Sequence, residues 1–213
     1  MNLLTSLLFP PKCVLCGKLL ENGEIDLCAD CRKTDSAYQN QKIHIPFLDS
    51  FTAVWYYEGN VRRSILRYKF YRARSRGAAF GRILGAKVLQ THPDGFDLLA
   101  WVPVSSLRKM KRGYDQSQLI AQALGRELGI SPTPLLKKIH HTPPQSGISD
   151  AAMRRANVSG AYRIRKGVDV AGKRILLVDD VFTTGATAGE CARILKINGA
   201  KEVHCAAVAA ARK

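Results

Sequence analysis

The sequence predicts an α/β fold in which helices flank a parallel sheet, preceded by a small module that contains four cysteines. Three observations lead to this prediction. Residues 175–178 form a continuous apolar run, as expected for a strand buried on both faces of a parallel sheet. Segments with helical periodicity follow the predicted central strands. Two Cys-x-x-Cys pairs separated by eleven residues stand near the beginning of the chain.

The four cysteines of these pairs favour a structural zinc site. Each pair can present two thiolates to one tetrahedral ion, and four thiolates leave no position open for a catalytic water. The alternatives are redox dithiols or disulfides, which are disfavoured because neither pair precedes a thioredoxin-like helix pattern. We expect a zinc-finger module over residues 1–45 and a second domain over residues 46–213. The expected ligands are Cys13, Cys16, Cys28 and Cys31.

Residues 1–9 are apolar but do not have the pattern of a signal sequence. They lack a basic start, contain Thr5 and Ser6, run directly into Pro10 and Pro11, and are too short to span a bilayer. We therefore expect this segment to pack on the protein without membrane insertion. A cytoplasmic location follows, where cysteines stay reduced or bind metal.

The formal net charge is +16, and it is unevenly distributed. Residues 1–50 contain five basic and six acidic side chains, so the whole excess lies in residues 51–213. Such an excess favours polyanionic partners: phosphorylated small molecules, nucleic acid or an anionic membrane surface. A basic protein without such a partner remains an alternative.

A predicted strand at residues 51–57 is followed by a strongly basic segment, residues 61–76. Basic and aromatic side chains alternate there without an acid, which is typical of surfaces that bind single-stranded nucleic acid. The alternative is a solvated helix whose Ile65, Leu66 and Tyr68 face the core. The candidate nucleic-acid contacts are Arg62, Arg63, Arg67, Lys69, Arg72, Arg74 and Arg76.

A strand–basic loop–helix unit occupies the middle of the chain. After a helix at 77–90, we expect a strand at 98–104, a basic loop at 105–114 and a helix at 115–128. The loop would lie at the carboxyl edge of the sheet, where ligands bind in open α/β folds. Arg108 and Arg112 are the predicted donors to a pyrophosphate, and a surface loop without a ligand is the alternative.

Residues 141–157 form a long polar connection of the kind often used as an active-site lid. Arg154 and Arg155 could meet an anion when such a lid closes. Further on, Gly167–Lys173 matches a phosphate-binding loop only superficially, because Arg174 replaces the required Ser or Thr and a strand follows it. This mismatch argues against an ATPase.

The most informative segment is the end of the apolar run. Asp179 and Asp180 stand where the strand is expected to end, and a helix is expected from Ala188 to Leu195, with Gly199 as its stop. Strand-end carboxylates can bind sugar hydroxyls and lie near Mg²⁺, and amides at a helix start bind phosphate. Together these features predict a phosphorylated-ribose site. Its turn residues are Thr183, Thr184, Gly185, Ala186 and Thr187.

This segment resembles the phosphoribosyl-pyrophosphate loop of type I phosphoribosyltransferases. The whole chain resembles the ComF family, also called GntX-like, through the double Cys-x-x-Cys, residues 102–104 and 112–116, residues 145–148, Arg154 and Arg155 with Asn157, and the loop from Asp179 to Thr187. The family more often has Asn at the position of Asp115. The resemblance implies a zinc finger on a type I phosphoribosyltransferase-like sheet domain and a link to natural competence, the handling of imported single-stranded DNA.

We therefore expect a cytoplasmic, competence-associated protein that binds phosphoribosyl pyrophosphate with Mg²⁺ and acts on or with single-stranded DNA, with possible partners in the competence machinery. If it is an enzyme, it is a phosphoribosyltransferase whose catalytic residues are Asp179, Asp180, Arg154 and Arg155. One alternative is a non-catalytic, zinc-dependent DNA-binding factor. A nucleobase-salvage phosphoribosyltransferase is a weaker alternative, because no clear base-recognition segment is found in the sequence.

Overall fold

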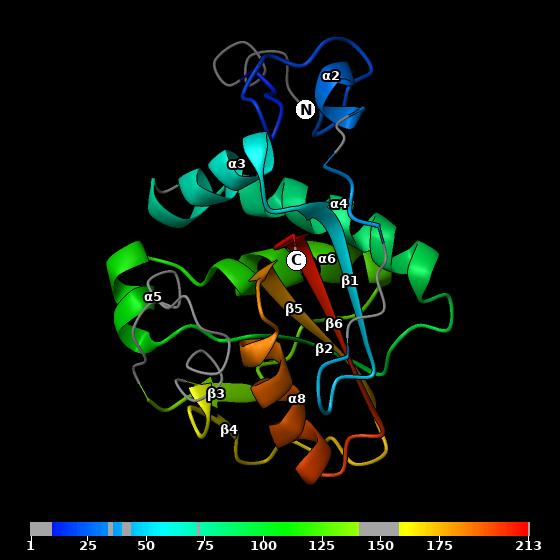
Figure 1. Ribbon diagram of the computed structural model, residues 1–213, viewed down its shortest axis with the longest axis vertical. Coiled ribbons are helices and arrows are strands. Elements are labelled where there is room, and N and C mark those ends of the chain that lie inside the picture. The colour runs from blue at the N-terminus through cyan, green and yellow to red at the C-terminus, as the bar shows by residue number, and fades with distance from the viewer. Residues whose placement is uncertain (1–9, 34–35, 40–43, 72, 141–157, 213) are drawn as a thin grey trace.

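The computed structural model describes residues 10–33, 36–39, 44–71, 73–140 and 158–212. Its centre is a four-stranded sheet in the order β1-β6-β5-β2, in which every neighbouring pair is parallel (Figure 1). The predicted α/β class with a parallel sheet is confirmed. The strands are β1 Ser50–Tyr56, β2 Leu98–Trp101, β5 Arg174–Phe182 and β6 Glu202–Ala210.

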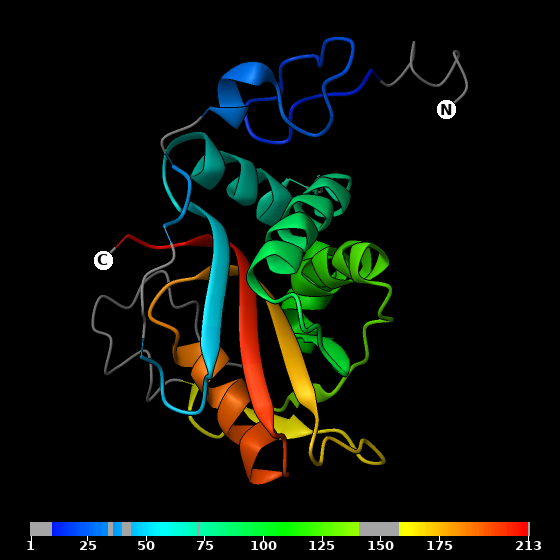
Figure 2. The same cartoon turned by 90° about the vertical axis from the view of Figure 1, so that its right-hand side faces the viewer.

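Helices cover both faces of this sheet. Helices α4 (Arg76–Thr91) and α6 (Gln116–Leu128) lie on one face, and α8 (Ala186–Ile197) lies on the other (Figure 2). Side chains of β5 alternate between two apolar clusters: Leu176 and Val178 pack on the α4/α6 side, and Ile175 and Leu177 pack on the α8 side. This two-sided burial explains why the strand reads as a continuous apolar run.

The close packing of α4 against α6 depends on a glycine. A Cβ atom placed on Gly81 would lie 2.4 Å from the Cβ of Ala123 and 2.6 Å from the carbonyl oxygen of Ile120. Both predicted helices are confirmed, with Ile120 and Leu124 of α6 fully buried. The two helices therefore approach to backbone contact along the same face of the sheet.

Strand β5 is longer than predicted. It continues through Asp179 and Asp180 to Phe182, because β6 is equally long and pairs with it up to Phe182 and Ala210. The ring of Phe182 also stacks on Phe51 at a centroid distance of 3.8 Å. The two acids are therefore held in a strand rather than in a loop.

The predicted basic loop at 105–114 is wrong in part, because it contains the short helix α5 (Ser106–Arg112). The Oγ of Ser105 accepts the amide N–H of Arg108 and caps the helix, and Gly113 ends it with a positive φ of 79°. Strand β2 correspondingly stops at Trp101, before Pro103, which cannot donate a ladder hydrogen bond.

The basic segment 61–76 divides between two helices. Helix α3 (Gly59–Phe70) carries most of it, with Ile65 and Tyr68 fully buried, and α4 begins at Arg76. The remaining elements were not predicted: α2 (Ala29–Arg32) and an antiparallel pair formed by β3 (Leu136–Lys138) and β4 (Tyr162–Ile164). None of the helices in the described ranges combines the length and apolar character needed to cross a bilayer.

Candidate functional site

The four predicted zinc ligands converge. The Sγ atoms of the two Cys-x-x-Cys pairs all lie within 4.8 Å of one another, and those of Cys16 and Cys28 are 3.7 Å apart. Four thiolates at about 2.3 Å from one tetrahedral ion would be separated by about 3.8 Å, so the cluster fits zinc. The tight turn after Cys13 is closed by a hydrogen bond from the Gly17 amide to the Cys13 carbonyl, with a positive φ of 85° at Gly17.

The backbone favours a thiolate at Cys13, whereas burial raises the pKa of Cys31. Burial opposes ionisation of Cys13, but backbone N–H donors, including those of Cys16 and Cys28, outweigh it and lower the pKa of Cys13 to about 7. Since zinc binds the thiolate form, this environment suits a metal ligand. The four-cysteine geometry supports a structural zinc ion.

The cysteine module is packed tightly on α3 and α4. Cys13, Cys28 and Cys31 belong to the same buried cluster as Trp55 and Ile65 of the sheet domain. Two further donors reach from the helices to the module: Ser64 Oγ and Arg76 Nη1 both donate to the Val14 carbonyl, the latter at 2.6 Å. Arg82 also holds Asp26 through two hydrogen bonds, of 2.9 and 2.5 Å. The cysteine module and the sheet domain therefore share one hydrophobic core.

The two strand-end acids lie side by side at the carboxyl edge of the sheet. Asp179 Oδ1 accepts the Ser117 hydroxyl at 3.0 Å and the Asp180 amide at 2.8 Å. Burial, followed by the charge of Asp180, raises the pKa of Asp179 to about 7. A carboxyl group with such a pKa is costly to ionise without a ligand, which is a common property of functional sites.

Asp180 has a different partner, because neighbouring side chains along a strand point to opposite faces. Its Oδ1 lies 2.8 Å from the Nζ of Lys69, and the two side chains are only 11% and 19% exposed. The sequence pattern predicts Lys69 as a nucleic-acid contact, and this prediction is wrong. The structure instead places its ammonium at the acid pair, because Lys69 lies on the inner side of the last turn of α3.

The predicted phosphate turn follows the acids directly. Gly185 adopts a positive φ of 77°, and a Cβ atom there would lie within 2.7 Å of both Ile45 and Phe182 side chains, so only glycine fits. The Ala186 amide bonds to the Thr184 hydroxyl at 3.4 Å. Within the described part of the chain, the amide N–H groups of Thr183, Thr184 and Gly185 have no protein acceptor. These amides stand at the start of the 12-residue helix α8.

Arg108 lies near a lysine that was missed in the sequence, Lys138, which is in turn near Asp179. Burial, then Arg112, lowers the pKa of Arg108, and Tyr162 is its neighbour. Lys138 of β3 lies 5.2 Å from the centroid of the Tyr162 ring, and burial and Arg108 lower its pKa to about 8, while Asp179 opposes that shift. Lys138 was missed because the short β3–β4 pair that holds it has no clear sequence pattern.

Arg112 is oriented differently from Arg108. Its Nη1 donates to Gln116 Oε1 at 2.8 Å, and its guanidinium carbon lies 5.2 Å from the centroid of the exposed Phe70 ring. Asp115, where the ComF family more often has Asn, accepts the amides of Val104 and Gln118 and caps α6. Burial raises its pKa.

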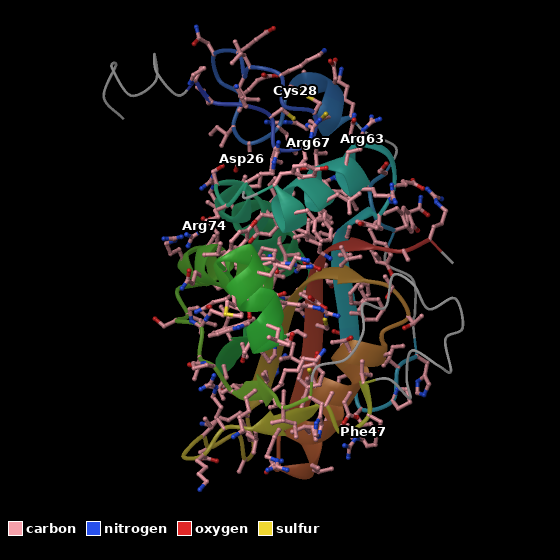
Figure 3. All side chains as sticks on the ribbon, turned by 90° about the vertical axis from the view of Figure 1, so that its left-hand side faces the viewer. Asp26, Cys28, Phe47, Arg63, Arg67 and Arg74 are labelled. Carbon is pink, nitrogen blue, oxygen red and sulfur yellow. The ribbon has the colours of Figure 1, made fainter. Side chains whose placement is uncertain are left out.

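Among the described residues of the predicted basic surface, four arginines are exposed. Arg63 and Arg67 lie on the side of α3 that faces the cysteine module, with Arg74 near the other end of that helix (Figure 3). Arg76 is partly buried and donates a hydrogen bond to the Val14 carbonyl, so it links α4 to the cysteine module. The exposed members are Arg62, Arg63, Arg67 and Arg74.

Three predicted site residues, Arg72, Arg154 and Arg155, lie outside the described residues. A pocket of about 510 Å³ borders the turn between His44–Phe47 and the start of α8. Its described lining contains Thr184, Gly185 and Ala186 but neither acid. This pocket therefore borders the turn but does not reach the acid pair.

Comparison with known families agrees with both parts of the structure. Residues 4–41 match the family described as Double zinc ribbon domain, and residues 110–213 match the family described as Phosphoribosyl transferase domain. The second match contains α6, the acid pair and the turn at Thr183–Thr187, and it begins inside α5.

Several curated proteins are similar to this chain. DNA utilization protein YhgH of Salmonella typhi is 35% identical over 141 residues, which are 64% of this chain and 61% of that protein. Competence protein F of Haemophilus influenzae is 29% identical over 200 residues, 91% of this chain and 82% of that protein. Competence protein ComFC of Streptococcus pneumoniae is 25% identical, with 90% and 96% covered.

Among solved structures, the glutamine phosphoribosylpyrophosphate amidotransferase from B. subtilis matches with a TM-score of 0.44 and 23% identity, over 67% of this chain and 30% of that chain. Phosphoribosylpyrophosphate synthetase from Mycobacterium smegmatis matches with a TM-score of 0.41 and 19% identity, over 61% and 33%. The resemblance seen in the sequence is confirmed by the curated proteins and the family matches: this chain is similar to competence protein F and ComFC proteins, with one segment that matches a double zinc ribbon and another that matches a phosphoribosyl transferase domain.

Proposed function

We propose that the acid pair and the turn after β5 bind phosphoribosyl pyrophosphate with Mg²⁺ in a competence-associated protein. The observation that carries this proposal is the juxtaposition of Asp179 and Asp180 with the turn before α8, in which the amides of Thr183, Thr184 and Gly185 have no protein acceptor among the described residues. Carboxylates suit ribose hydroxyls, and amides at a helix start suit a phosphate. The ribose and the 5′-phosphate of the ligand thus match two adjacent groups of the site.

The ribose hydroxyls would be bound by Asp179 and Asp180, and the 5′-phosphate by the amides and hydroxyls of Thr183–Thr187. Arg108 and Lys138 are the nearby cations that would meet the pyrophosphate, together with the predicted Arg112. The carboxylate pair also fits Mg²⁺, which takes one or two carboxylate oxygens together with ligand phosphates. When bound, the ion would neutralise charge on the pyrophosphate group.

If the protein is catalytic, its site must stabilise a sugar carbon that becomes positive as pyrophosphate departs. Asp179 and Asp180 would place negative charge beside that carbon, and the half-buried setting would strengthen the interaction. Cations at the opposite end of the ligand would stabilise the leaving group. The assignment of Arg154 and Arg155 to a closing lid stays a prediction, and pyrophosphate release in the presence of candidate acceptors would test for turnover.

Calorimetry of the zinc-loaded protein tests the binding site directly. We expect phosphoribosyl pyrophosphate to bind in the presence of Mg²⁺, and the double variant Asp179→Asn/Asp180→Asn to lose binding at least about a hundredfold, since each lost charged hydrogen bond costs on the order of 1.5–3 kcal/mol. Asp94→Asn, an exposed acid at the amino edge of the sheet, is the matched control. Equal affinity in the double variant and the control would refute the assignment.

A second activity, binding of single-stranded DNA, is favoured by the four exposed arginines together with the exposed rings of Phe70 and Tyr71. We propose that this surface acts with the phosphoribosyl-pyrophosphate site during DNA uptake, as the names of the competence relatives suggest.

Fluorescence anisotropy with an oligo-dT strand at several salt concentrations tests this second activity. Replacing the four arginines by Ser should weaken binding and reduce the salt slope by about 1 per lost phosphate contact. Replacing four other exposed basic residues by Ser is the control: Arg163, Lys166, Lys173 and Lys201. Equal losses in both variants would mean that only net charge matters.

A further inference from the structure

The ion pair between Lys69 and Asp180 differs from the exposed ion pairs of this protein, because both of its side chains are largely shielded from solvent. Its Nζ–Oδ1 distance is 2.8 Å, and both side chains are largely buried, whereas other cations of α3, such as Arg62 and Arg67, are exposed. Burying an ammonium and a carboxylate costs several kcal/mol per ion before their attraction is counted. Such a pair needs a reason beyond fold stability, because apolar residues would fill the same space at lower cost.

The charge arithmetic of the site supplies a reason. Two adjacent carboxylates repel each other, and the ligand-free protein needs a cation beside them or a proton on one of them. Lys69 neutralises Asp180, while Asp179 is held by neutral donors, the Ser117 hydroxyl and a backbone amide. The raised pKa of Asp179 is consistent with one carboxylate being neutralised by Lys69 and the other retaining a proton near neutral pH.

We propose that the Lys69 ammonium occupies the place of a divalent cation beside Asp180 in the ligand-free protein, and that it moves to the diphosphate of the ligand when the metal-bound ligand arrives. This inference rests on the proposed phosphoribosyl-pyrophosphate site. It assigns Lys69 two successive anionic partners and makes it a positioning residue for both states.

The surroundings of Lys69 permit this exchange. Lys69 lies one position before the last residue of α3, Phe70, and the ring of Phe70 contacts the guanidinium of Arg112 from α5. Arg112, one of the cations predicted to meet the diphosphate, therefore lies next to the end of the helix that carries Lys69. A lysine suits this role because its ammonium is a compact charge on a flexible stem of four carbons. The guanidinium of an arginine is planar and rigid, so it requires a partner with matching geometry.

Divalent-ion binding without the ligand tests the first half of the proposal. Zinc-loaded protein is titrated with Mn²⁺ alone and followed by electron paramagnetic resonance. We expect Lys69→Gln to bind Mn²⁺ at least about tenfold more tightly than the wild type, because an ammonium no longer competes for Asp180. Lys69→Arg should stay close to the wild type. Lys173→Gln, which removes the same charge at the amino edge of the sheet, should not change Mn²⁺ affinity.

Binding of inorganic pyrophosphate with Mg²⁺ tests the second half. By calorimetry, Lys69→Gln should weaken pyrophosphate binding about tenfold, since one charged contact is lost, and Lys173→Gln should not. Opposite changes in the two affinities, tighter for the ion and weaker for pyrophosphate, are the result that a merely structural ion pair would not produce.

The possible failures are distinguishable. If Lys69→Gln leaves Mn²⁺ affinity unchanged or lowers it, the proposal is wrong whether or not the protein binds phosphoribosyl pyrophosphate. If the Mn²⁺ result is as expected but neither pyrophosphate nor phosphoribosyl pyrophosphate binds to the wild type, Lys69 is a stand-in cation, the transfer to a diphosphate is overturned, and the proposed function fails with it.

Discussion

Replacing Asp179 by Asn should make the ligand-free protein more stable at alkaline pH while removing its ligand binding. The substitution keeps the size of the side chain and an oxygen that can accept the Ser117 hydroxyl and the Asp180 amide. What it removes is a charge that the folded protein solvates poorly. The effect should therefore depend on pH.

The sign and size follow from proton linkage. Burial and Asp180 raise the pKa of Asp179 from 3.8 to about 7, so between these values the folded state binds more protons than the unfolded state. Stability then falls as pH rises through this window. A shift of about three pKa units corresponds to at most about 4 kcal/mol, and relaxation around the ionised carboxylate would lower this figure. We expect Asp179→Asn to gain about 1–4 kcal/mol at pH 8 and almost nothing at pH 4.

Urea unfolding of zinc-loaded protein, followed by circular dichroism at pH 4, 6, 7 and 8, measures this difference. The exposed Asp94→Asn variant is the control and should show no pH-dependent gain. The reasoning is refuted if Asp179→Asn is less stable than the wild type at pH 8, or if its gain is the same at every pH. Phosphoribosyl-pyrophosphate binding by the wild type should itself strengthen from pH 6 to pH 8, as Asp179 ionises.

Three further outcomes are expected. Removing zinc with a chelator should lower the Tm of the whole chain by at least about 5 °C, reversibly on zinc addition, because the cysteines share a core with Trp55. An unchanged Tm would show that the stability of the sheet domain does not depend on the cysteine module. Gly81→Ala should cost about 1–3 kcal/mol in urea unfolding, because its Cβ meets Ala123 of α6; a gain, as at an exposed helix glycine, would contradict the packing. Ser117→Ala should move the pH midpoint of phosphoribosyl-pyrophosphate binding upward, since it removes a donor to ionised Asp179; an unmoved midpoint would rule out that contact.

Features that depend on neighbouring residues could be predicted from the sequence. The spacing of the cysteines predicted one four-sulfur cluster, and the run before Asp179 predicted a strand buried on both faces. Gly185 lies in the predicted turn, and it adopts a positive φ there. Each of these predictions rests on covalent geometry or local periodicity, which a short segment carries within itself.

The partners of individual charges could not be predicted in this way. Lys69 and Arg62 look alike in the basic segment, yet one pairs with Asp180, which lies 111 positions further along the chain, and the other is exposed. Arg76 donates a hydrogen bond to the Val14 carbonyl. Lys138 lies near Asp179 on a short strand that no sequence pattern predicts.

The sequence by itself therefore determined the chemical groups of this protein: four thiolates, two adjacent carboxylates, a hydroxyl-rich turn and an excess of basic side chains. Only the tertiary structure decided which cation faces which anion, and that the cysteine module shares its core with the sheet domain. The physical reason is that a charge is defined by its residue, whereas its burial and its partner are set by segments far away in the chain that pack against it.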